Sequence, residues 1–226
     1  MSPSLPRRPA LLAPWAQGLG QRFDLQALRP PEATATEASL QAVRQTAAWQ
    51  ALLDWCWAGA GPGHSPWWQP GAQPAVTQRL AVAALCGPDP AATRDWANAL
   101  ACQIDGSLLL ADQPHRAAAL GLRLRVKLTD AMWWRVRQRA DPWDAGWART
   151  SPQGLRQFQG RFAPRRATLV LADPRQADLL QPCLAALAAR SDGLRHPLRW
   201  LWVGGEEGAD DLSSPLKPTV PRFSLR

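Results

Sequence analysis

Tyrosine is absent from the sequence and lysine nearly so, with only two lysines among 26 basic residues, whereas tryptophan occurs 13 times. Together with alanine-rich segments, this usage is typical of a GC-rich coding bias, so the abundance of arginine reflects composition before it reflects function. The arginines stand as singles and pairs and form no long basic block. A net charge of +8 therefore favours a solvated basic surface over a nucleic-acid groove.

Long hydrophobic runs are also missing, since no apolar stretch approaches the ~18 residues that a membrane-spanning helix requires. The apolar stretch PALLAPWA follows Arg7 and Arg8, but it is too short and too interrupted by proline for a signal peptide. We therefore expect a cytoplasmic protein without a membrane span. Hydrophobic residues make up 46% of the chain, which is enough for a packed core.

Cysteine and histidine are few and are not spaced as metal ligands. The cysteines contain no C-x-x-C pair, and the histidines form no ligand-spaced cluster with them, which argues against a zinc site. Cys86, Cys102 and Cys183 lie in apolar surroundings, so we expect small, buried, reduced side chains there. No Ser-His-Asp or Cys-His arrangement indicates nucleophilic catalysis.

The most informative stretch is RLAVAALCGPDPAATRDWANALACQIDG, residues 79–106. Its apolar run, 80–85, has the length of one buried strand. Glycine and prolines in 86–90 interrupt this strand, and a pattern of helical period follows over 92–104. A strand, a glycine-containing turn and a helix in this order predict the frame of a phosphate-binding loop.

The remaining apolar segments alternate between strand-like and helix-like periodicity. This alternation predicts an α/β fold with three αβα layers and a mainly parallel sheet. In such sheets ligands bind at the carboxyl ends of the strands, an edge that would carry both the 87–94 loop and Asp173. The further expected strands are 107–111, 122–128, 167–172 and 198–203, and the further expected helices are 35–58, 131–140, 153–162 and 176–190.

Proline and glycine mark the limits of the expected domain. We expect residues 1–74 to form a proline-rich arm, a helix capped by Thr36, and a linker. Residues 75–205 then form the α/β domain, and residues 206–226 form a flexible tail. In the last helix, Pro182 is expected to introduce a kink or to mark a later start.

Two segments resemble the nucleotide-binding motifs of P-loop NTPases. RLAVAALCGPDPAATRDWANALA resembles the strand, Walker A loop and first helix, and PRRATLVLADP, a hydrophobic strand ending in Asp173, resembles a Walker B strand. The helix DLLQPCLAALAAR followed by HPLRWLWVGG is similar to the region after Walker B in the STAND group of signal-transduction ATPases, relatives of the AAA+ and NACHT proteins. PWDAGWART is also similar to a segment of bacterial STAND-like proteins. The resemblance spans residues 76–205 and implies a P-loop NTPase-like domain.

The resemblance implies a nucleotide site at four positions. In P-loop NTPases, backbone amides and a lysine hold the phosphates, a Ser/Thr hydroxyl ligates Mg²⁺, and the Walker B acid supports the metal. When G-x-x-x-x-G-K-[ST] is aligned from Gly87, the second glycine falls on Ala92, the lysine on Thr93 and the hydroxyl residue on Arg94. The candidate nucleotide-binding residues for Mg-ATP are therefore Gly87, Thr93, Arg94 and Asp173, and Asp173 is also the candidate metal ligand.

Several losses in the same motifs argue against ordinary ATP hydrolysis. Thr93 lacks the positive charge of the lysine, and Arg94 does not ligate a cation. Pro88 and Pro90 remove two backbone N–H groups from the loop, and Pro174 stands where an acid often follows the Walker B aspartate. We therefore expect neither a catalytic residue nor a bound cofactor.

Each candidate residue also has an interpretation without a ligand. Gly87 fits a turn residue of the fold as well as a phosphate binder. Asp173 is either a metal ligand or the N-cap of the helix that follows it. Arg94 either contacts an anionic ligand or pairs with Asp89 or Asp95.

Three functional hypotheses follow. The first is a catalytically degenerate P-loop NTPase-like protein that acts as a protein-interaction, regulatory or accessory module, with another protein as its partner. The second is an atypical nucleotide-binding ATPase that takes its positive charge from Arg94 or Lys127. The third is a basic nucleic-acid-binding module in the WWRVRQR segment, where aromatic rings would stack on bases beside arginines. Its candidate residues are Trp133, Trp134, Arg135, Arg137 and Arg139.

Overall fold

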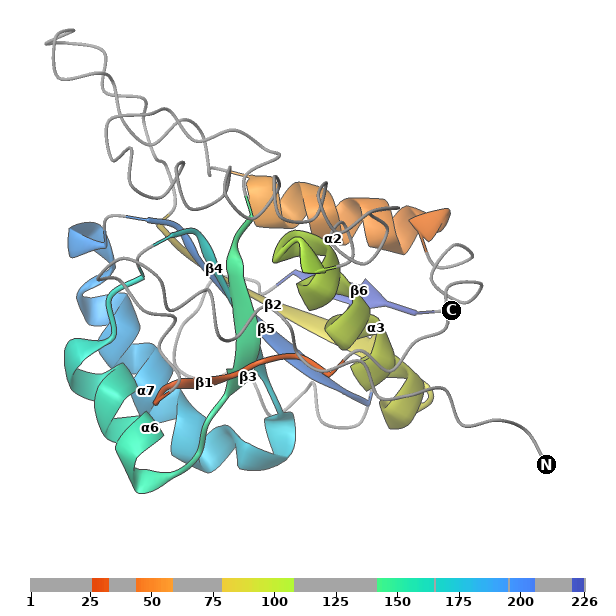
Figure 1. The fold of residues 1–226 in the computed structure, drawn as a ribbon. Coiled ribbons are helices and arrows are strands. Elements are labelled where there is room, and N and C mark those ends of the chain that lie inside the picture. Colours follow the sequence, from red (N-terminus) through yellow and green to blue (C-terminus); the bar gives the residue numbers. More distant parts are fainter. Residues whose placement is uncertain are drawn as a thin grey trace, which may run out of the picture.

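The computed structural model describes residues 26–32, 44–58, 79–107, 142–164, 166–194, 196–205 and 221–225. These residues form one six-stranded sheet with helices on both faces (Figure 1). The strand order is β1-β3-β4-β5-β2-β6. The strands are β1 (Leu28–Arg29), β2 (Leu80–Gly87), β3 (Asp144–Ala148), β4 (Thr168–Ala172), β5 (Leu198–Gly205) and β6 (Arg222–Ser224).

The sheet is parallel except at one edge. β3, β4, β5, β2 and β6 run in the same direction, and only β1 pairs antiparallel, with β3. The central strand β4 is buried at all five positions, as expected for a parallel strand that is covered on both faces. The prediction of an α/β fold with a mainly parallel sheet between helical layers is therefore confirmed.

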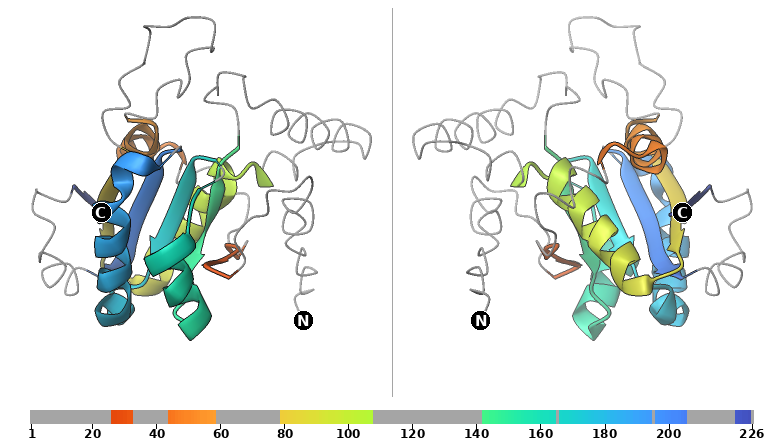
Figure 2. Two further views of the ribbon diagram at one scale, coloured as in Figure 1. Left: turned by 90° about the vertical axis from the view of Figure 1, so that its left-hand side faces the viewer. Right: turned by 90° about the vertical axis from the view of Figure 1, so that its right-hand side faces the viewer.

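Helices cover the two faces of the sheet in separate groups (Figure 2). One face carries α2 (Ala47–Trp57) and α3 (Pro90–Ile104). The other face carries α6 (Pro152–Arg156), the π-helical turn η1 (Gln157–Arg161) and α7 (Ala177–Ala189). Two 3-10 turns flank α7, η2 (Pro174–Gln176) and η3 (Ser191–Gly193).

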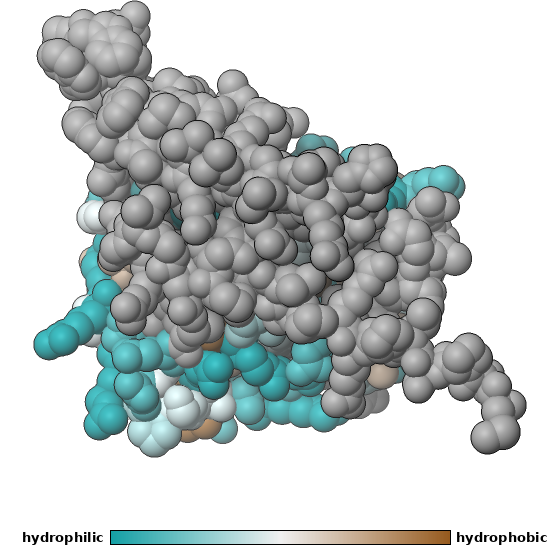
Figure 3. All heavy atoms as spheres, in the orientation of Figure 1, coloured by the Kyte–Doolittle hydropathy of each residue, from teal (hydrophilic) through white to brown (hydrophobic). Residues whose placement is uncertain are grey.

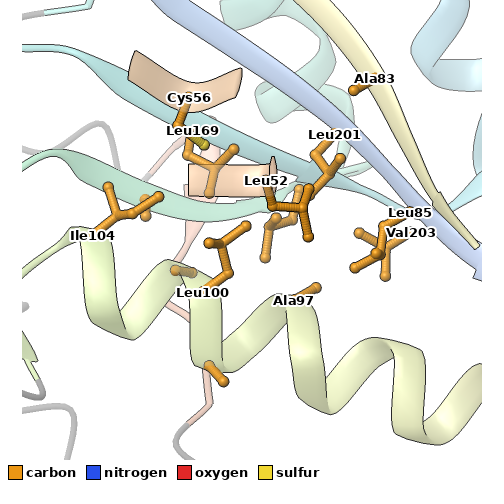
Figure 4. Packing of buried hydrophobic residues seen from close by; sticks show 14 of the residues in the cluster. Leu52, Cys56, Ala83, Leu85, Ala97, Leu100, Ile104, Leu169, Leu201 and Val203 are labelled. Atoms are coloured by element: carbon orange, nitrogen blue, oxygen red, sulfur yellow. The ribbon is translucent and has the colours of Figure 1, made fainter. Parts of the chain in front are cut away.

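Two hydrophobic cores lie between these layers. On the α6–α7 side, Leu180 and Leu187 pack with Trp200, whose ring contacts Phe158 at 5.5 Å between ring centroids. On the opposite side, leucines of α2 and α3 pack on those of β4 and β5 (Figure 4). Each fully buried leucine of this kind stabilises the fold by about 1.5–3 kcal/mol. The surface visible in Figure 3 is, where described, mainly hydrophilic, because the apolar side chains point into these cores.

The apolar runs predict the central strands well and their limits less well. The expected strands at 167–172 and 198–203 correspond to β4 and β5, and the expected helix at 153–162 corresponds to α6 and η1. The expected break at Cys86 is wrong, because Cys86 and Gly87 continue β2 through their pairing with the end of β5. The expected later start at Pro182 is wrong, since α7 begins before Pro182 and continues past it.

The helix expected over 35–58 is interrupted at Thr46. α2 begins after Thr46, which has an extended backbone and whose Oγ1 accepts a hydrogen bond from the Trp49 N–H at 3.2 Å. The prediction of one continuous helix over 35–58 is therefore wrong, because the helix is interrupted at Thr46. The expected N-cap, Thr36, lies outside the described residues. α2 is held on the sheet by the buried Arg199 of β5, whose Nε donates to the Cys56 carbonyl at 3.1 Å and whose Nη2 donates to the Ala58 carbonyl.

Three strands escape the sequence patterns. β3 has the sequence DAGWA, and Asp and Gly are depleted in strands. β1 and β6 have two and three residues, too few to show a period. β1 falls within the segment expected to be an arm, and β6 falls within the expected tail. The expected elements at 122–128 and 131–140, and all but the first residue of 107–111, lie outside the described residues.

The described helices include none that is long and apolar enough to cross a membrane.

Candidate functional site

The carboxyl ends of three neighbouring strands form the candidate site. β5 lies between β2 and β4 in the sheet, so the segments after β2 and β4 flank the end of β5. These segments contain Asp89 and Asp173, and β5 ends there in Gly204 and Gly205. The predicted juxtaposition of the loop after β2 with Asp173 is confirmed by the contact between Arg94 and Asp173.

The start of α3 is stabilised by groups of its own loop. Asp89 is the N-cap, and its Oδ1 accepts a hydrogen bond from the Ala91 N–H at 2.9 Å. Pro90 follows as the first helical residue, where its missing N–H costs nothing. The Thr93 N–H and hydroxyl both donate to the Asp89 carbonyl, at 2.9 and 2.7 Å. Thr93 is only 1% exposed, and its hydroxyl is bonded to the backbone at the start of α3.

Arg94 faces Asp173 across the end of β5. Its Nη1 lies 3.8 Å from Asp173 Oδ2, with the two side chains 47% and 23% exposed. Its guanidinium carbon also lies 4.5 Å from the centre of the Trp147 ring, within the range of a cation–π interaction. Trp147 is fixed in turn by a 2.8 Å hydrogen bond from its Nε1 to Asn98 Oδ1. Arg94 is therefore held on two sides.

The expected pairing of Arg94 with Asp89 or Asp95 is corrected by this geometry. Those two acids are neighbours in sequence, whereas the observed partner, Asp173, comes from the end of a different strand. No local spacing could have revealed this pair. Trp147 lies in the PWDAGWART segment, but nothing in that segment indicated a contact with Arg94.

Asp173 is the N-cap of η2, which confirms one of the two interpretations of this residue. Its Oδ1 accepts a hydrogen bond from the Arg175 N–H at 2.9 Å, and Pro174 follows as the first residue of η2. Its role as a metal ligand stays a prediction. The described residues contain no group of three or more His, Cys, Asp or Glu side chains placed to hold a metal ion.

Two glycines at the strand ends allow other residues to approach closely. A Cβ atom at Gly87 would lie 2.4 Å from Thr93 Oγ1, so only glycine fits against the buried hydroxyl. A Cβ atom at Gly204 would lie 2.5 Å from Cγ of Pro174, so the proline ring lies directly over the end of β5. Gly87 thus has a packing role in the fold, and a role in phosphate binding stays a prediction.

A second polar cluster lies where α3 ends and β3 begins. Ser107 donates to Asp105 Oδ1 through its N–H at 2.7 Å and its hydroxyl at 2.5 Å. Burial, assisted by the charge of Asp144, raises the pKa of Asp105 to about 7, although the Ser107 hydrogen bonds oppose this shift. Asp144 itself pairs with Arg166 at 3.9 Å, and both side chains are buried. Sequence reasoning missed this cluster because Asp105 carries no motif that predicts burial.

All four cysteines are buried and form no disulfide, as three of them were expected to be. Burial raises the pKa of Cys56 and of Cys102 to about 12, so neither is a nucleophile at neutral pH. The candidate nucleic-acid-binding residues lie outside the described part of the chain, as does Lys127, and they stay predictions. These residues are Trp133, Trp134, Arg135, Arg137 and Arg139.

A scan against protein-family models, a search of curated proteins and a search of solved structures each gave no match to this chain. The described residues form an α/β fold with a six-stranded, mostly parallel sheet flanked by helices.

Proposed function

We propose that this protein is a catalytically degenerate P-loop NTPase-like protein that works by binding another protein, as a regulatory or accessory module. The observation that carries the proposal is the ion pair between Arg94 and Asp173. These are the positions that correspond to the Walker A hydroxyl and the Walker B acid, which together hold Mg²⁺ in active members of the family. Here the guanidinium supplies the positive charge beside the carboxylate, in the place of a metal ion.

The loop before α3 is unsuited to phosphate for a second reason. A phosphate-binding loop offers free backbone N–H groups at a helix N-terminus. Pro88 and Pro90 have none, and the N–H groups of Ala91 and Thr93 are bound to Asp89. The Asp89 carboxylate already places a negative charge at this helix N-terminus, where it stabilises the helix dipole and repels a phosphate.

The proposal is tested by calorimetric titration of the full chain with Mg-ATP and Mg-GTP. We expect no saturable heat for the wild type and none for Asp173→Asn, which removes the charge but keeps a residue that caps helices well. Asp192→Asn serves as the matched control, because it removes an exposed carboxylate from the other end of α7. Saturable Mg²⁺-dependent binding that is lost in Asp173→Asn and kept in Asp192→Asn would contradict the proposal.

One observation favours a second candidate, an atypical nucleotide-binding protein. Arg94 is half exposed and pre-positioned on Trp147, so it could turn its guanidinium towards a phosphate without much loss of side-chain freedom. This candidate requires that Arg94→Ala weakens nucleotide binding strongly. The first candidate requires that the same substitution leaves the titration flat.

A further inference from the structure

β6 is the outermost strand of the sheet beyond β2, and β2 holds it much less extensively than it holds β5. β2 pairs with β5 over eight residues, whereas it pairs with β6 over three. Arg222 and Ser224 of β6 are exposed, and Phe223 between them is half-buried. Because segments with few buried apolar contacts open at a low cost in free energy, β6 should separate from β2 long before β2 separates from β5.

Backbone hydrogen bonds attach the segment 221–225, which contains β6, to the outer edge of β2. The Ala84 N–H donates to the Pro221 carbonyl at 3.0 Å. The Leu225 N–H donates to the Cys86 carbonyl at 2.9 Å. Bonds of this kind involve no side chain, so another extended segment with the same strand direction can form them equally well.

Two side chains of this segment pack on the core beneath α2. The Phe223 ring contacts the Trp55 ring of α2 at 6.2 Å between ring centroids, and β6 lies beside α2 (Figure 1). Leu225 lies two residues further along, on the same side of the segment, and packs on the same core. Its side chain lies over Gly87, where a Cβ atom would be 3.4 Å from Leu225 Cβ. The edge of β2 therefore holds an aromatic side chain followed, two positions later, by an aliphatic one.

We propose that the outer edge of β2 beside α2 is a peptide-binding site, which the segment 221–225 of the same chain occupies in the manner of a ligand. The partner is an extended segment of another protein that adds parallel to β2 in place of β6. It places an aromatic side chain on Trp55 and an aliphatic one, two residues later, over Gly87. The inference rests on the proposed function only for the role of binding another protein, and it is independent of the resemblance to P-loop NTPases.

Hydrogen exchange of the full-length wild type tests whether β6 opens by itself, and it needs no substitution. The Ala84 and Leu225 amides, which join β2 to the segment 221–225, should exchange at least about tenfold faster than the amides of the buried central strand β4. Equal protection of these two groups of amides would overturn the proposal, because β6 would then open only when the whole domain unfolds.

Fluorescence anisotropy with the labelled peptide TVPRFSL, which reproduces residues 219–225, tests the site itself. The site is opened in the full chain by the double variant F223A/L225P, which loses the ring on Trp55 and the N–H that donates to the Cys86 carbonyl. The peptide should bind this variant saturably. It should bind the wild type at least about tenfold more weakly, because the segment of the same chain competes at a high effective concentration.

Two matched controls make the binding test specific. Ser224→Ala changes an exposed side chain of β6 and keeps both apolar contacts, so this variant should bind the peptide as weakly as the wild type does. The peptide TVPRASL, which lacks the aromatic ring, should bind F223A/L225P at least about tenfold more weakly than TVPRFSL does. Circular dichroism melts verify that each variant stays folded.

Two binding results would overturn the proposal. One is a peptide that binds F223A/L225P no more tightly than the wild type, which would place an added strand outside β6 or nowhere. The other is equal binding of TVPRFSL and TVPRASL, which would remove the contact with Trp55 as the source of specificity. Saturable binding of Mg-ATP would contradict the proposed function alone, so the two proposals fail by different measurements.

Discussion

Arg94 and Asp173 face each other at 3.8 Å and join the N-terminal part of α3 to the end of β4. The two residues are far apart in sequence, and between them lies the end of β5. Asp173 uses its other carboxylate oxygen to cap η2, so a single side chain fixes two segments. The guanidinium of Arg94 places a positive charge beside the Asp173 carboxylate at this edge of the sheet.

The Arg94–Asp173 pair should contribute measurably but modestly to stability. Arg94 is half exposed, so the ion pair is worth less than ~1 kcal/mol, and its contact with Trp147 adds a similar amount. We expect Arg94→Ala to lower the free energy of unfolding by about 1 kcal/mol in urea titrations. A double-mutant cycle with Asp173→Asn isolates the ion pair. A coupling energy that is unchanged at high salt would show that the two side chains do not interact through charge.

Gly204 should not tolerate a side chain, because its Cβ would lie 2.5 Å from Cγ of Pro174. We expect Gly204→Ala to lower the free energy of unfolding by about 1–3 kcal/mol, since either the proline ring or the end of β5 must shift. Chemical denaturation measures the effect. Pro174→Ala should relieve part of the loss in the double variant, because it removes the atoms that clash.

Gly193→Ala is the matched control for this prediction. A Cβ atom at Gly193 meets nothing within 4 Å, and the substitution should have little effect on unfolding. Equal losses at Gly193 and Gly204 would mean that the contact with Pro174 is not the cause.

Asp105 should make stability depend on pH between about 4 and 7. Its folded-state pKa is raised to about 7, whereas an aspartate in an unfolded chain titrates near 3.9. Between these values the folded state binds more protons than the unfolded state, so the free energy of unfolding falls as pH rises. The stabilising contribution is fully present below about pH 4 and is lost above pH 7, with a size of about 2–4 kcal/mol.

Asp105→Asn should flatten this pH dependence. The amide stays uncharged at every pH and keeps an oxygen that accepts from Ser107. Unfolding free energies at pH 5 and pH 8 measure the difference, and the variant should exceed the wild type in stability at pH 8. Asp192→Asn, at an exposed site, should retain the wild-type slope. A wild-type slope in Asp105→Asn would assign the dependence to another group.

The sequence predicts those parts of the fold that are decided locally. β2, β4 and β5 appear as apolar runs because both of their faces are buried, and the turns after β2 and β4 appear as Asp-Pro pairs. Both aspartates proved to be helix caps, a role that their position before proline favours. Local chemistry of this kind leaves a direct signature in the sequence.

The missed features depend on contacts between distant segments. β1 and β6 are strands only because β3 and β2 offer them hydrogen-bonding partners. The partner of Arg94 follows from the strand order, and the raised pKa of Asp105 follows from the packing of α3 against β3. Neither can be deduced from spacing along the chain, since each requires the topology first.

The position of β2 in the sheet has a consequence for biosynthesis. β2 precedes its two neighbours, β5 and β6, by a long stretch of chain, with Leu80 paired to Leu198 and Ala84 to Arg222. An apolar segment therefore emerges from the ribosome long before the strands that shelter it. Non-local pairing of this kind slows folding and exposes the nascent chain to aggregation. The apolar side chains of β2 thus lack their sheltering neighbours on the nascent chain until β5 has been synthesised.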